Sequence, residues 1–88
     1  MMFTGYWIAE NRIYGPKASG YFFIDNDKVY GPESWGDFFI KNDQGSDVLH
    51  SGTFHGPKYS GLFHIVDKKI YGPNEVLPWL ENWETANT

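Results

Sequence analysis

Two of the three histidines, His55 and His64, are the side chains best suited to catalysis or metal binding. The alternation of residues along the expected strands places both on one sheet face, together with Asp37. Two imidazoles and a carboxylate can hold zinc, or one imidazole can act as a general base. The only support for such a cluster is this shared face. A small metal-dependent hydrolase is therefore the weaker of the alternatives we consider.

No other catalytic arrangement is present in the sequence. The chain has no cysteine, and it has neither a GxSxG nucleophile motif nor a glycine-rich phosphate loop. The acid pairs Asp25/Asp27 and Asp43/Asp47 fall in expected turns, where aspartate is common for conformational reasons. We therefore expect no enzyme activity and no cofactor or bound metal.

The face that carries the histidines is rich in tyrosine, and it is the best candidate for binding. Tyrosine offers a large contact area at a small entropic cost and keeps a polar tip, which suits it to interfaces. The candidate binding residues are Tyr6, Tyr14, Tyr21, Tyr30, Tyr71, Asp37, His55 and His64.

Three functions are compatible with this face. The first is a small protein-binding module, similar to an adaptor or inhibitor, which uses the tyrosines and the long loop 41–52. The second is a carbohydrate-binding module that uses the same aromatic residues, and the third is the hydrolase. The tyrosines could equally fill the second layer of a sandwich, in which case they are structural.

Four Gly-Pro pairs divide the chain into repeats. They lie at residues 15–16, 31–32, 56–57 and 72–73, and a shift of 41 residues overlays GPKASGYFFIDNDKVYGP on GPKYSGLFHIVDKKIYGP without a gap. Such self-similarity indicates an internal duplication. We expect one domain over residues 1–88, with repeat halves at about 4–41 and 45–83 and a frayed tail at 84–88.

Each half divides again into two units, which start with TGYWIA, SGYFFI, WGDFFI and SGLFHI. Aromatic and branched residues bounded by turn formers are typical of strands, and ENR, DND and VDK fit tight turns. Aligning the units on their glycines predicts an apolar inner face. Its members are Trp7, Ala9, Phe22, Ile24, Phe38, Ile40, Phe63 and Ile65 from the first strands, and Ile13, Val29, Phe54 and Ile70 from the second strands.

The expected fold is therefore an all-β antiparallel meander of four tandem hairpins, with about eight short strands forming a small barrel or sandwich. The free ends of such a meander could also pair with a second copy and give a homodimer. After Pro73, the apolar residues Val76, Leu77, Leu80 and Trp83 recur at helical spacing. We expect one short C-terminal helix near residues 75–83.

Composition narrows the range of partners. The net charge is −4, and the seven basic residues form no stripe, so we expect no nucleic-acid binding. No apolar run approaches the ~18 residues of a membrane helix, and the N-terminal residues do not resemble a signal peptide. We expect a cytoplasmic protein whose partner is another protein or a second copy of itself.

The aromatic-glycine hairpin units resemble, in general character, other short β-hairpin repeats such as the choline-binding and WG-type repeats of bacteria. Here the unit has about 16 residues, and its Gly-Pro strand ends differ from the patterns of those families. The resemblance implies no function or functional residue for this chain.

Overall fold

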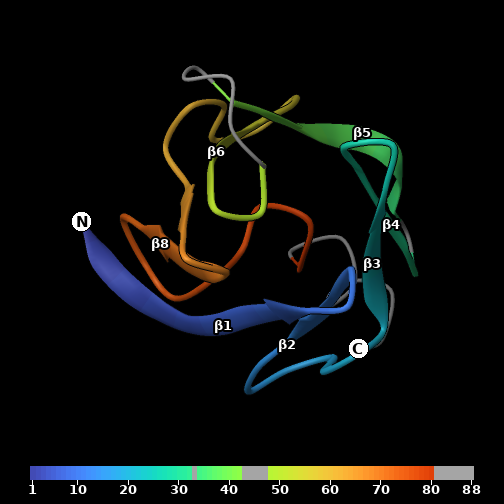
Figure 1. Cartoon of the computed structure of the whole chain (residues 1–88), viewed down its shortest axis with the longest axis horizontal. Coiled ribbons are helices and arrows are strands. Elements are labelled where there is room, and N and C mark those ends of the chain that lie inside the picture. The colour runs from blue at the N-terminus through green and yellow to red at the C-terminus, as the bar shows by residue number, and fades with distance from the viewer. Residues whose placement is uncertain (33, 43–47, 81–88) are drawn as a thin grey trace.

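A computed structural model describes residues 1–32, 34–42 and 48–80, and it shows a closed antiparallel barrel of eight strands (Figure 1). Each strand pairs with the next, and the last pairs with the first, so the predicted meander is confirmed as a barrel and the sandwich is excluded. The strands are β1 (Met2–Ala9), β2 (Arg12–Tyr14), β3 (Phe22–Asp25), β4 (Lys28–Gly31), β5 (Ser34–Lys41), β6 (Ser51–His55), β7 (His64–Val66) and β8 (Lys69–Gly72).

Closure of the barrel removes one reason to expect a dimer. Met2 and Phe3 of β1 pair with Gly72 and Tyr71 of β8 within the same chain. The edge strands at the two ends of the meander therefore satisfy each other's backbone hydrogen-bonding groups, as in other closed barrels, and do not need a second copy.

Three of the four hairpins turn through two residues in the left-handed region. These are Glu10–Asn11, Asn26–Asp27 and Asp67–Lys68, whose φ angles lie between 50° and 70°. Two consecutive left-handed residues define the turn whose twist matches that of the flanking strands. The tight turns expected at ENR, DND and VDK are thus confirmed, and the turn at Asp67–Lys68 is the one without asparagine.

We predict that Lys68→Gly raises the free energy of unfolding by about 0.5–1 kcal/mol, because glycine adopts the left-handed conformation without strain. Lys68 has a φ of 67°, and its backbone N–H bond to the Leu49 carbonyl is independent of the side chain. Urea denaturation followed by circular dichroism measures the change. The neighbouring Lys69→Gly, within β8, is the control and should destabilise the protein; a loss of stability in Lys68→Gly would contradict the turn assignment.

The core lies inside the barrel and consists of inward-facing side chains from every strand, together with residues that follow β8. All four residues predicted from the second strands are buried, and so are six of the eight predicted from the first strands. The buried apolar residues are Tyr6, Ile8, Ile13, Phe22, Ile24, Val29, Phe38, Ile40, Phe54, Phe63, Ile65, Ile70, Leu77, Trp79 and Leu80.

The predicted inner face was wrong in the first unit. Tyr6 and Ile8 are buried, whereas Trp7 is 45% exposed and Ala9 is half-buried. The register of β1 against β8 shifts between Phe3 and Trp7, and the Thr4 hydroxyl donates a hydrogen bond to the Ile70 carbonyl at this irregularity. Alignment on the glycines misplaces this unit by one residue, and a shift of one residue exchanges the two faces of a strand.

The glycine of every Gly-Pro pair packs against the first core aromatic of its own unit. A Cβ atom added at Gly15, Gly31, Gly56 or Gly72 would lie 2.2–2.5 Å from a ring carbon of Tyr6, Phe22, Phe38 or Phe63, respectively. Such distances are far inside van der Waals contact. The repeated Gly-Pro therefore serves the scaffold, because only glycine lets the strand end pass so close to the ring.

The chain after β8 plugs one end of the barrel, and it is not the helix that we expected over residues 75–83. Pro78 and Trp79 form a turn, Leu80 alone is helical among the described residues, and residues 81–83 lie outside them. The Trp79 ring is fully buried, with ring centroids 5.0 Å from Phe54, 5.8 Å from Phe38 and 6.4 Å from Phe22. Proline at position 78 lacks the N–H that a continuous helix requires there.

The long segment before β6 covers the opposite end. Val48 and Leu49 pack against the core, and they line a pocket with the turn residues of the β3–β4 hairpin. The Leu49 and His50 carbonyls accept hydrogen bonds from the backbone N–H groups of Lys68 and Asp67. In Figure 1 this yellow-green segment and the red segment after β8 both cross the middle of the ring. The described end of loop 41–52 thus helps to close the barrel, while residues 43–47 lie outside the description.

Candidate functional site

A belt of rings surrounds the outside of the barrel. In each hairpin, the outward residue of the first strand is paired with the tyrosine or histidine that precedes Gly-Pro. Trp7 stacks on Tyr14, Phe23 on Tyr30 and Phe39 on His55, with ring centroids 5.6–6.2 Å apart. In the fourth hairpin His64 is directly opposite Tyr71. We call these residues the outer belt: Trp7, Tyr14, Phe23, Tyr30, Phe39, His55, His64 and Tyr71.

Polar side chains fill the positions between these pairs. The first-strand ring of each unit lies opposite a residue of the preceding hairpin: Arg12 opposite Phe23, Lys28 opposite Phe39, Thr53 opposite His64 and Lys69 opposite Trp7. The Arg12 guanidinium lies 5.8 Å from the centroid of the Phe23 ring. Cross-strand aromatic and cation–π pairs of this kind stabilise a sheet by about 0.2–1 kcal/mol each.

The outer belt explains why tyrosine recurs before Gly-Pro. The Tyr14 ring stacks on Trp7 and also covers Gly20. The Tyr30 ring covers Gly36 in the same way. Gly20 and Gly36 have φ angles of 80° and 86°, where a side chain would be both strained and in contact with the tyrosine. A contact made in successive units is architectural, so the belt by itself does not mark a specific site.

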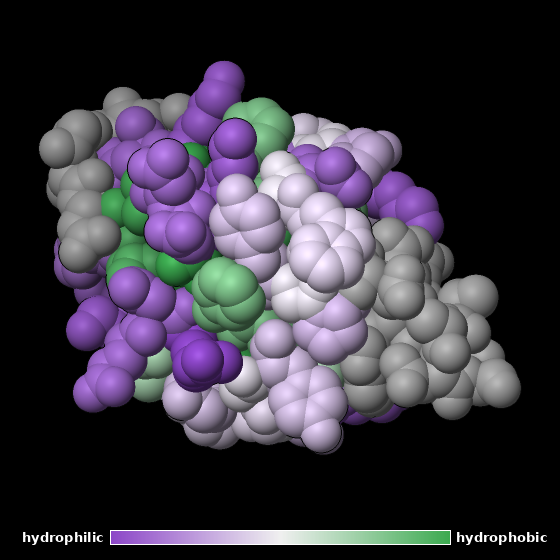
Figure 2. Space-filling view, turned by 90° about the vertical axis from the view of Figure 1, so that its right-hand side faces the viewer, coloured by the Kyte–Doolittle hydropathy of each residue, from purple (hydrophilic) through white to green (hydrophobic). Residues whose placement is uncertain are grey.

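One part of this surface carries more exposed aromatic residues than the paired rings of the outer belt account for. Trp35 of β5 is 77% exposed, it is directly opposite Tyr30, and it makes no ring contact with a described residue. Tyr30 is in turn opposite Phe23, while Tyr21, just before β3, is 58% exposed. We call these four residues, which span β3, β4 and β5, the Trp35 patch. Figure 2 views this side of the molecule, where pale residues, the colour of tyrosine and tryptophan, gather near the middle.

The predicted binding residues fall into three groups. Tyr6 is 3% exposed and belongs to the core, so its predicted place on the outer face was wrong. Tyr21 and Asp37 are exposed on the outside next to the belt. The remaining five all lie on the outer belt and are half-buried, namely Tyr14, Tyr30, Tyr71, His55 and His64.

The structure does not bring His55, His64 and Asp37 together, as the weaker hydrolase alternative would require. Among the described residues, no three histidine, cysteine or acidic side chains come close enough together to hold a metal ion. His55 contacts the Ser60 hydroxyl at 3.2 Å, whereas His64 contacts the Thr53 hydroxyl at 3.1 Å through its Nδ1. Both imidazoles therefore have separate hydroxyl partners, and Asp37 is not part of a shared cluster.

Trp35 was not among the binding residues predicted from the sequence. It lies in β5, three residues before the core ring Phe38. The corresponding residue of the first unit is Phe3, three residues before Tyr6, whereas the second and fourth units carry Ser19 and Ser60 there. Alignment on the core rings would have revealed this alternation of aromatic residue and serine.

Comparisons with protein-family models, with curated proteins and with solved structures found no match for this chain. Within the part of the chain that the structure describes, no helix is long and apolar enough to cross a membrane.

Proposed function

We propose that this protein is a non-catalytic module that binds another protein through the Trp35 patch. The observation that carries the proposal is the exposure of Trp35, with 77% of this residue in water beside three further aromatic residues. Tryptophan and tyrosine are the commonest anchors of protein interfaces. Tyr30 is held by Phe23 on one side and by the backbone pairing of β4 to β5 on the other, so its ring is oriented before it binds.

The size of the patch favours a short segment of the partner. The exposed parts of Tyr21, Phe23 and Trp35 amount to about 350 Å², given ~150–250 Å² for each aromatic side chain. A stable contact between two globular proteins buries about 800 Å² on each. An extended segment can fill the smaller area, and the stacked rings of Phe23 and Tyr30 limit the entropy that binding costs.

A peptide selection tests the proposal. A phage library of random 12-residue peptides is selected on the immobilised protein, and the enriched peptide is synthesised as the probe. Its affinity is then measured by calorimetry for the wild type, for Trp35→Ser and for Val66→Ser, a control whose valine is 48% exposed on β7.

We predict that Trp35→Ser weakens binding of this peptide at the Trp35 patch by at least about 30-fold, as expected for an anchor residue worth ~2 kcal/mol or more. Val66→Ser should leave the affinity unchanged. The stability of Trp35→Ser should equal that of the wild type, because the lost side chain is mostly in water. The proposal fails if no peptide is enriched or if Trp35→Ser binds as tightly as the control.

A further inference from the structure

The internal duplication gives the Trp35 patch a counterpart on the other side of the barrel. The shift of 41 residues that relates the two halves carries Tyr21, Phe23 and Tyr30 onto Leu62, His64 and Tyr71. Phe3 takes the place of Trp35, since each is directly opposite the tyrosine of the preceding strand. The ring centroids of Phe3 and Tyr71 are 5.6 Å apart. We call these four residues, Phe3, Leu62, His64 and Tyr71, the Phe3 patch.

The Phe3 patch is also exposed and also crosses three strands, β7, β8 and β1. Phe3 is 44% exposed and Leu62 is 50% exposed, while His64 and Tyr71 are half-buried. The irregular register that places Trp35 beside Tyr30 in β5 recurs in β1, where it places Phe3 beside Tyr71. The two surfaces are thus built by the same local geometry.

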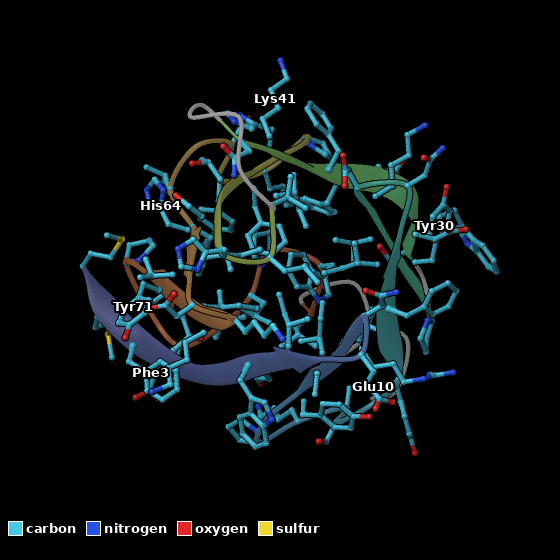
Figure 3. All side chains as sticks on the ribbon, in the orientation of Figure 1. Phe3, Glu10, Tyr30, Lys41, His64 and Tyr71 are labelled. Carbon is cyan, nitrogen blue, oxygen red and sulfur yellow. The ribbon has the colours of Figure 1, made fainter. Side chains whose placement is uncertain are left out.

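The two patches lie on opposite sides of the molecule. Their central strands, β4 and β8, are four strands apart in either direction around the eight-stranded barrel. Figure 3 shows Tyr30 on the right of the ring of strands, with Phe3, His64 and Tyr71 on the left. A short segment that covers one patch therefore leaves the other patch open to a second segment.

Each patch also has a lysine in the same position. Lys28 precedes Tyr30 by two residues on β4, and Lys69 precedes Tyr71 by two residues on β8, so each lysine shares the outer face with its tyrosine. Both lysines are exposed, and neither forms an ion pair with a described residue, although Lys28 is directly opposite Asp25 whereas Lys69 is opposite Val66. A carboxylate in the bound segment would complement this charge beside the aromatic rings.

We propose that the protein is bivalent: the Trp35 patch and the Phe3 patch each bind one copy of the same short partner segment, which carries large apolar side chains next to an acidic residue. This inference rests on the proposed function and adds the number of sites and the chemistry of the occupant. The Phe3 patch is the weaker site, because Leu62 and His64 offer less aromatic surface than Tyr21 and Phe23. Two occupied patches would bring two partner molecules together on one barrel.

Calorimetry with the selected, synthesised 12-residue peptide tests this arrangement. The wild type should bind two peptides per chain, while Trp35→Ser and Phe3→Ser should each bind one, and the variant with both changes none. Lys28→Gln and Lys69→Gln should each weaken one site only, and the selected sequence should contain aspartate or glutamate. Val76→Ser, a change of a valine that is 41% exposed after β8, serves as the control and should keep both sites.

The possible failures are distinguishable. One peptide per chain that is lost in Trp35→Ser and unaffected by Phe3→Ser would overturn bivalency and leave the proposed function standing. One peptide per chain that either change abolishes would show a single segment wrapped across both patches, and would also overturn the inference. Enriched peptides without an acidic residue would overturn the assigned chemistry of the occupant, whereas a selection that enriches nothing would overturn the proposed function itself.

Discussion

Replacing Trp79 with alanine is expected to lower the free energy of unfolding by about 3–5 kcal/mol, the cost of removing a buried tryptophan from a packed core. Trp79 is fully buried and contacts the rings of Phe22, Phe38 and Phe54, which come from three different strands, β3, β5 and β6. A domain of this length has a total stability of only about 4–13 kcal/mol, so the loss removes much of it. Urea denaturation followed by circular dichroism measures the change.

Two further variants show whether the loss of stability comes from emptying the barrel end that Trp79 plugs or from the loss of any tryptophan. Trp35→Ala removes the same side chain from the surface and should change stability by less than about 0.5 kcal/mol. Trp79→Phe keeps an aromatic ring in the plug and removes the indole N–H, which is buried and has no hydrogen-bond partner among the described residues. Relief of that unpaired donor, worth ~1–3 kcal/mol, should offset part of the lost packing. Equal losses in Trp79→Ala and Trp35→Ala would contradict the assignment of Trp79 as the plug.

The second large effect is expected at the glycine of the last Gly-Pro pair. Gly72→Ala would place a Cβ atom 2.2 Å from Cδ2 of Phe63, a ring that has no exposed surface and cannot move away. Overpacking of this kind costs about 1–3 kcal/mol, and we expect the upper end of this range. The midpoint of urea denaturation should fall accordingly, with the unfolding slope unchanged.

A double-mutant cycle shows whether the ring causes this loss. Phe63→Leu makes room beside residue 72, so Gly72→Ala should cost clearly less in that background than in the wild type. Gly61→Ala is a useful comparison, because its Cβ atom would meet only a His55 ring atom at 3.9 Å while its φ of 82° still disfavours alanine. Additive losses at residues 63 and 72 would be incompatible with direct contact between the ring and the glycine.

Most of the fold could be predicted from the repeat and the alternation of side chains. The errors arose where a local irregularity alters the alternation. Tyr6 and Trp7 were assigned to each other's faces. Gly5 lies one residue before the core ring of its unit, whereas the glycines of the other units lie two residues before theirs. The core rings Tyr6, Phe22 and Phe63 each precede the glycine of Gly-Pro by nine residues, and an alignment on that spacing gives isoleucine two residues after each of these rings.

The tail could not be predicted from helical spacing alone. Leu77 and Leu80 are buried as helical periodicity suggests, but Val76 is 41% exposed and Trp79, which that periodicity did not select, fills the end of the barrel. The shape of the open barrel end, which accepts one large ring among three others, decides this packing. No local sequence signal reports that shape.

The candidate site was predicted only in part. The sequence identified an outer face rich in tyrosine, and the structure divides that face into a repeated belt and an excess of exposed rings. Tyr14, Tyr30 and His55 stack within the belt, so their types are explained by the scaffold. Alignment on the core rings places Trp35 and Phe3 at equivalent positions, but their exposure depends on the irregular registers of β5 and β1, which the sequence pattern does not report.

The most direct test of the central claim, that the Trp35 patch is a binding surface, is chemical-shift mapping of the isotope-labelled protein with the selected peptide. The proposed function predicts that the indole N–H of Trp35 and the backbone amides of Tyr21, Phe23 and Tyr30 show the largest shifts at low peptide concentration. Signals of Phe3 and Tyr71 should follow as the second site fills. Shifts confined to residues 48–52, or to the barrel end around Trp79, would contradict the claim.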